Sequence, residues 1–119
     1  MKKSMFIILA FFSFFSMSFI AAEDQLLSTS LRITVLNELG NIEEGATVVL
    51  YKTEEDYEEG ANAVATGETD KKGRVNFKNL EPIIYFVHAE NGERNNYGAG
   101  IQTTPLTEGK MNRVNIVIE

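Results

Sequence analysis

Apolar and polar residues alternate most clearly in the stretch Leu31-Arg32-Ile33-Thr34-Val35. Successive side chains of a β-strand point to opposite faces, so this alternation predicts a half-buried strand whose three apolar residues face a core. The end of the chain has a similar pattern, in which Val114, Ile116 and Ile118 are expected to face inward. Both ends of the domain are therefore predicted to be strands.

Five more short strands are expected between these two, over residues 46–52, 63–69, 74–77, 83–89 and 97–103. The segments between successive strands contain Gly, Asn, Asp or Pro, the residues that favour turns. Residues 63–69 and 74–77 are expected to form a hairpin around Asp70-Lys71-Lys72-Gly73, and residues 53–62 are interpreted as a charged loop. Seven short strands without a longer helical period predict an all-β fold, a seven-stranded antiparallel Greek-key sandwich.

Residues 1–22 have the order of a secretory signal peptide. Lys2 and Lys3 precede an apolar run that ends in Ala21-Ala22, and Glu23-Asp24 then begins a polar stretch. An uncleaved membrane anchor is the alternative, because the run is nearly long enough to span a bilayer. The chain contains no Cys, so a lipid anchor on a cysteine is excluded. We expect a secreted or periplasmic protein with a signal peptide at 1–22, a mobile lead at 23–30 and a β-sandwich domain at 31–119.

Removal of the signal would leave 97 residues, with nine basic residues against 17 acidic ones, because Lys2 and Lys3 leave with it. The net charge then falls from −6 to about −8. An acidic domain is not expected to bind nucleic acid or an anionic membrane surface, since both select basic patches. Without disulfides, an exported domain of this size depends on β-sheet packing for its stability.

Two motifs resemble carboxypeptidase-regulatory-like domains. Residues 35–50 contain an Asn37-x-x-Gly40 turn and a Gly45-Ala46 pair before the second strand, and residues 69–82 resemble the family block Thr-Asp-x-x-Gly-x-Phe-x-Phe-x-x-Leu-x-Pro, followed by Tyr85. The chain departs from the family at Ile83, where a Gly is usual. The resemblance covers residues 31–90 well and the last two strands only by length and pattern.

This resemblance implies a transthyretin-like (prealbumin-type) sandwich, of the immunoglobulin/transthyretin kind, and most such domains are non-catalytic. Two related groups with sharper functions do not fit. Surface domains of the Cna-B type form a Lys–Asn isopeptide bond, but Arg32 is the only basic residue of the first strand. Hydroxyisourate hydrolases need several His and a C-terminal Tyr-Arg-Gly-Ser, whereas this chain has one His and ends Val117-Ile118-Glu119.

Few residues could act in catalysis or bind a metal ion. His88 is the only His, and Ser28 and Ser30 are the only serines after the predicted signal. A catalytic serine needs a base such as His beside it, and a zinc ion needs several His or Cys ligands. We therefore expect no enzyme activity and no cofactor.

An acidic run and an apolar face are the two candidate binding features. Oxygen ligands for Ca²⁺ could come from Glu54, Glu55, Asp56, Glu58 and Glu59, although such runs are usually solvated. If Tyr85 and Val87 face the core, Ile84 and Phe86 face outward together with Val49 and Tyr51. Such an apolar face suggests an unknown partner or a homo-oligomer, unless the lead covers it through Leu26 and Leu27.

These observations predict an exported non-catalytic module for protein or glycan binding, or for a structural role in the bacterial envelope. A calcium-dependent adhesion or assembly module that uses the acidic run is one alternative. An accessory domain of an enzyme system is another.

Overall fold

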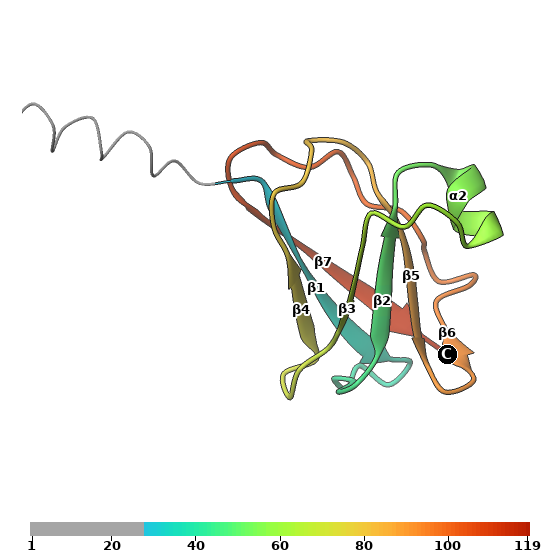
Figure 1. Cartoon of the computed structure of the whole chain (residues 1–119). Helices are drawn as coiled ribbons and strands as arrows, with labels where there is room; N and C mark the ends of the chain where they lie inside the picture. Colours follow the sequence, from blue (N-terminus) through green and yellow to red (C-terminus); the bar gives the residue numbers. More distant parts are fainter. Residues whose placement is uncertain (1–27) are drawn as a thin grey trace, which may run out of the picture.

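Two β-sheets pack face to face in residues 28–119, the part of the chain that the computed structural model describes (Figure 1). Sheet A has three strands in the order β4-β1-β7, and sheet B has four in the order β3-β2-β5-β6. The predicted signal peptide at 1–22, most of the predicted lead, and Leu26 and Leu27 lie outside the described residues. The prediction of an all-β sandwich is confirmed.

The elements follow one another along the chain as β1 (Ser30–Asn37), β2 (Thr47–Tyr51), α2 (Glu54–Glu59), β3 (Ala65–Glu68), β4 (Arg74–Phe77), β5 (Phe86–Asn91), β6 (Arg94–Asn95) and β7 (Met111–Ile118). Within residues 28–119, no helix is long and apolar enough to cross a membrane.

The core lies between the sheets and follows the alternation of the strands. Leu31, Ile33 and Val35 of β1 are fully buried, as predicted. They share the core with Ile116 and Ile118 of β7 and with the inward residues of sheet B, Ala46, Val48, Leu50, Val87 and Ala89. Burial of this apolar surface is the main force that holds the two sheets together.

The expectation of purely antiparallel pairing is wrong at one place. β1 pairs with β4 in antiparallel fashion but with β7 in parallel, and Leu31 and Val35 lie opposite Asn112 and Ile116 in the latter pair. Parallel neighbours require a long crossover, and here the whole of sheet B lies between the two strands in the chain. Alternation is the same in both pairings, so the sequence pattern does not distinguish them.

The predicted hairpin of residues 63–69 with 74–77 is also wrong. β3 pairs with β2 in sheet B, whereas β4 pairs with β1 in sheet A, so the turn between them passes from one sheet to the other. The Asp70 carboxylate accepts hydrogen bonds from the amides of Lys72 (2.9 Å) and Arg74 (3.1 Å). The two strands instead face each other across the core. Gly67 of β3 and Val75 of β4 approach so closely that a Cβ on Gly67 would lie only 2.7 Å from Cγ2 of Val75.

The interpretation of residues 53–62 as a loop is corrected by a short helix, α2. Thr53 caps its start by accepting a hydrogen bond from the amide of Asp56 (3.0 Å), and Gly60 ends it with a left-handed φ of 66°. This N-cap followed by an acidic residue three positions on, with a C-terminal Gly, is a sequence signature of a helix.

The predicted strand at 97–103 is replaced by a loop that Asn96 holds in place. Asn96 is fully buried; its Oδ1 accepts from the amide of Ala89 (3.0 Å), and its Nδ2 donates to the carbonyl of Val87 (2.8 Å). The Asn96 side chain thus satisfies backbone groups of β5 that a neighbouring strand over residues 97–103 would otherwise have satisfied. The segment keeps one isolated bridge, between Phe86 and Gln102, and β5 begins at Phe86 instead of Ile83.

Candidate binding surface

On the outer face of sheet B, α2 packs against β2 and β5. Tyr51, one of the four predicted partner-surface residues, is only 7% exposed, because the ring of Tyr57 packs edge-on against it with centroids 5.9 Å apart. The other three, Val49, Ile84 and Phe86, are half-buried. The chain's own helix therefore packs on Tyr51, one of the residues that were predicted to meet a partner.

Tyr57 stands at the centre of an aromatic cluster on this face. Its ring lies 5.9 Å from that of Tyr97 and 6.2 Å from that of His88. Its hydroxyl has no hydrogen-bond partner within residues 28–119, and burial, with Tyr97 adding to it, raises the pKa of Tyr57 to about 12. The Nε2 of His88 lies 3.2 Å from Oε2 of Glu90. The cluster fastens the helix and the loop at Tyr97 to β5.

The predicted calcium ligands all lie on α2. Glu54, Glu55 and Asp56 form its first turn, and Glu58 and Glu59 its last. Oδ1 of Asp56 accepts a hydrogen bond from Nδ2 of Asn62 (3.2 Å). Residues 28–119 contain no group of three or more His, Cys, Asp or Glu side chains arranged to hold a metal ion.

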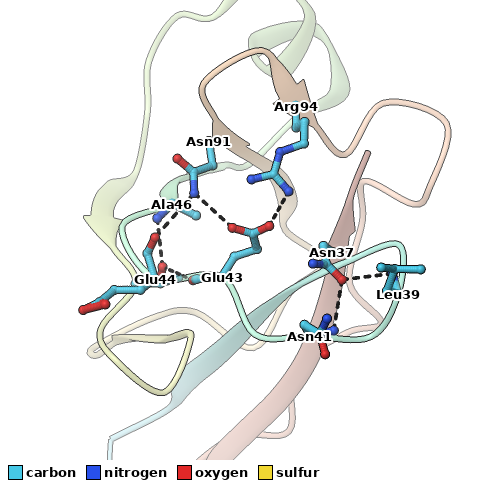
Figure 2. Close-up of polar contacts among 9 residues, drawn as sticks. Asn37, Leu39, Asn41, Glu43, Glu44, Ala46, Asn91 and Arg94 are labelled. Carbon is cyan, nitrogen blue, oxygen red and sulfur yellow. Dashed lines mark hydrogen bonds and ion pairs between the residues drawn. The ribbon is translucent and has the colours of Figure 1, made fainter.

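Figure 2 shows a polar cluster around Glu43, in the loop between β1 and β2. Its Oε1 accepts from Arg94, and its Oε2 accepts from Nδ2 of Asn91 (3.1 Å), so the loop is tied to β5 and β6. The hydrogen bond from Arg94 lowers the pKa of Glu43. Its carbonyl also accepts from the buried Thr69 hydroxyl (2.6 Å), which itself accepts from the amide of Ala46 (2.9 Å). This cluster positions loops.

The outer face of sheet A is more open than these surfaces, because its outward residues on β4 and β7 (Arg74, Asn76, Arg113 and Asn115) are exposed. The alternation that sends Leu31 and Ile33 inward sends Arg32 and Thr34 outward. Register places Arg32 beside Asn76 of β4 on one side and Arg113 of β7 on the other. We call this the cationic face, and its six basic residues are Arg32, Lys71, Lys72, Arg74, Lys78 and Arg113.

A cleft of about 420 Å³ lies in this face, lined by Arg32, Asp70, Lys71, Lys72, Arg74 and Asn76. The guanidinium of Arg32 is oriented in it, because its Nε donates to Oδ1 of Asn76 at 2.9 Å. A smaller hollow of about 250 Å³ is lined by Ser28, Ser30, Lys78 and Met111. Ser30 and Met111 are register partners, two residues along their strands from the pair Arg32 and Arg113, so this hollow adjoins the cationic pair. The two hollows thus belong to one surface.

None of the charges of the cationic face forms a salt bridge within residues 28–119. The ion pairs found there are Lys52–Glu81, His88–Glu90 and Arg94–Glu43, and none involves the six residues. Asp70 is the one acidic residue lining the cleft. The hydrogen bonds that its carboxylate accepts from the backbone amides of Arg74 and Lys72 lower its pKa. Six of the nine basic residues after the predicted signal therefore share one surface of an acidic protein.

Sequence reasoning missed this surface because net charge averages over the whole chain. The signal was present in the outward positions of three strands. These are Arg32 and Thr34, then Arg74, Asn76 and Lys78, then Arg113 and Asn115, and none of them is acidic. Only the pairing of β4, β1 and β7 shows that the three sets lie side by side.

No family model and no curated protein matches the chain. Among solved structures, a chain of the Bacillus anthracis TIE protein is similar, with a TM-score of 0.54 and 17% sequence identity. The match covers 77% of this chain and 17% of that one, so the chain spans about a sixth of the length of that protein. At this identity the likeness concerns the fold, and this chain is a β-sandwich similar to part of that protein.

Proposed function

We propose that this chain is an exported, non-catalytic β-sandwich module that binds a macromolecule of the cell envelope through its cationic face. The observation that carries the proposal is the placement of Arg32 directly beside Arg113, with Arg74 in the next row and no ion pair to any of them within residues 28–119. The resemblance of residues 31–90 to carboxypeptidase-regulatory-like domains, most of which are non-catalytic, supports a binding role.

Like charges on neighbouring strands repel one another and lower stability. A fold that needed only to be stable would place acidic and basic residues together there, and the chain has acidic residues in excess. These instead lie largely elsewhere, five of them on α2. An anionic partner would relieve the repulsion, so the arrangement favours binding over a purely structural role.

The two faces of the sandwich support different tasks. On sheet B, α2 packs against β2 and β5, and its Tyr57 lies against Tyr51. The cationic face presents charged and amide side chains and two hollows. Binding through sheet A leaves the aromatic cluster undisturbed.

The test compares retention of purified protein on washed envelope fractions from the cells that make it. We expect the wild type to be retained and Arg32→Glu/Arg74→Glu to be released. The matched control is Lys52→Glu/Lys110→Glu, which changes the net charge by the same amount at two exposed residues that do not line the cleft. Equal retention of the face variant and the control would overturn the proposal.

Export is tested separately, by the mass and N-terminal sequence of the protein in each cell fraction. We expect a mature chain that begins at Glu23 and is recovered outside the cytoplasm. An intact chain that stays with the membrane would favour the anchor, and a cytoplasmic one would contradict export.

A further inference from the structure

We infer that the ligand of the cationic face is an anionic polysaccharide, whose repeated acid groups meet the arginines and lysines while its hydroxyls meet the neutral polar residues between them. This inference rests on the proposed function and adds the chemical class of the ligand. The argument uses the spacing of the cations, the residues between them and the side chains that the face lacks.

The cations form a track along β4 and across to β7. Arg74 and Lys78 lie four residues apart, which is about 13 Å along an extended chain. Arg32 and Arg113 lie on neighbouring strands, roughly 5 Å apart at the backbone. Lys71 and Lys72 extend the track into the turn at Asp70. A ligand with one acid group would meet only a part of this track, so its length favours a polymer.

Neutral hydrogen-bonding side chains fill the gaps between the cations. Thr34 and Asn115 are register partners in the row of Arg74, and Asn76 lies in the row of Arg32. Oδ1 of Asn76 accepts from Arg32, so the two N–H groups on its Nδ2 can donate to a ligand. Amides and hydroxyls that both donate and accept suit the hydroxyls of sugars.

The same face lacks what other polyanions use. The outward residues of β1, β4 and β7 include no aromatic side chain, and proteins that hold single-stranded nucleic acid stack its bases on aromatic rings. Protein partners usually anchor on a central aromatic or apolar cluster. Here the outward apolar residues lie at the two ends of the sheet, with Leu36 and Val117 at one end and Met111 at the other, and none of them lines the cleft. A polysaccharide is therefore favoured over nucleic acid and over protein.

The test titrates the full-length mature protein, by calorimetry at low ionic strength, with polygalacturonate as the carboxylate probe and a poly(glycerol phosphate) teichoic acid as the phosphodiester probe. Dextran is the uncharged control. We expect binding to at least one anionic glycan and none to dextran. Affinity should fall at physiological ionic strength, because the Debye length shortens from about 30 Å at 0.01 M to about 8 Å at 0.15 M.

Arg32→Glu/Arg74→Glu should lower the affinity at least about tenfold, since it removes two charge-assisted contacts and adds repulsion. Lys52→Glu/Lys110→Glu should stay within about twofold, which corrects for net charge. Both changes are at exposed or half-buried sites, and a circular dichroism melt confirms that each variant folds. Comparison of the two glycans then tells which acid group is preferred.

Several outcomes would overturn the inference. One is tighter binding of poly-glutamate peptide or single-stranded DNA than of either anionic glycan at equal charge. Another is a dimer in sedimentation that Arg32→Glu/Arg74→Glu dissolves, which would assign the face to a second copy. If envelope retention depends on the face but no glycan binds, the inference fails and the proposed function stands. If retention does not depend on the face, the proposed function fails.

Discussion

Arg32 and Arg113 are register partners in the parallel pairing of β1 with β7, and both side chains leave sheet A on the face away from the core. Side chains so placed on neighbouring strands interact directly, and two positive charges there repel. The stability of the unbound domain is thus lower than the same sheet could have, and the cost falls at the proposed binding surface.

Arg113→Glu is expected to stabilise the unbound domain by about 0.2–1 kcal/mol, because it replaces the repulsion by an attraction to Arg32. Urea unfolding at low salt measures this gain, which should shrink at high salt. Arg113→Gln, which only removes the repulsion, should fall between the two. The variant that gains stability should lose affinity for the proposed anionic ligand, and a stability loss in Arg113→Glu would contradict the assigned repulsion.

Asn96→Ala is expected to lower the free energy of unfolding by about 2–4 kcal/mol. The change removes hydrogen bonds to Ala89, Val87 and Gly100 at a fully buried site, and leaves backbone groups of β5 without partners. The control is Asn95→Ala, which loses one exposed bond to the amide of Tyr97. If the two variants unfold at the same denaturant concentration, Asn96 does not hold the loop.

Gly73→Ala should cost about 1–3 kcal/mol more than Gly40→Ala. Both glycines have a left-handed φ, 72° and 85°, so both variants carry the strain of that conformation. At Gly73, however, the new Cβ would lie 2.9 Å from Cβ of Ile42 and 3.1 Å from the carbonyl oxygen of Val35, whereas Gly40 has open space. Thermal melts of the two variants measure the difference, and equal melting temperatures would mean that the turn moves aside freely.

Tyr57→Phe should change the alkaline limb of the stability curve. The folded pKa of Tyr57 is raised to about 12, so this tyrosine contributes stability that is full below its unfolded pKa of about 10 and is lost as pH rises through 12. Phe cannot ionise, so the variant should lose less stability than the wild type between pH 10 and 12. At neutral pH it should be about as stable as the wild type, because the hydroxyl lacks a partner within residues 28–119. Parallel alkaline limbs for the two proteins would sink this prediction.

Glu43→Gln should reduce the acid sensitivity of the fold. Arg94 lowers the folded pKa of Glu43, so its contribution is present above the unfolded pKa of about 4.3 and is lost as pH falls through the lower folded value. The wild type should therefore exceed the variant in stability at neutral pH, and the difference should close in acid. Glu44→Gln, the exposed neighbour, is the control. A difference between wild type and Glu43→Gln that is constant from pH 7 to pH 2 would rule out the ion pair as its source.

The motif residues that carried the family resemblance meet in the structure. Thr69 bonds to Glu43 and Ala46 and so joins the Gly45-Ala46 turn to the block that begins at Thr69. The hydroxyl of Tyr85 accepts from the amide of Glu81 (2.9 Å), and Leu80 packs against the core. The side-chain oxygens of Thr69 and Tyr85 thus hold turns of the chain, and Leu80 adds to the core between the sheets.

The strands and their inward residues could be predicted from the alternation at Leu31–Val35 and at Val114–Ile118, because alternation follows from backbone geometry alone. The helix α2 could also have been found, from the cap at Thr53 and the C-terminal Gly60. The helix has only six residues, which is too short for a periodic pattern, and five of them are acidic, which favours the interpretation as a charged loop.

Local sequence established which residues point inward and where the chain turns, since both depend on neighbours along the chain. The partner of each strand depended on long-range packing: β4 joined β1 instead of β3, and β7 joined β1 in parallel. That pairing placed Arg32, Arg74 and Arg113 on one surface, and Tyr57 packed against Tyr51 on the opposite one. Coulomb interactions and burial depend on distance in space, so the location of the cationic face, the proposed binding surface, was decided by the tertiary structure.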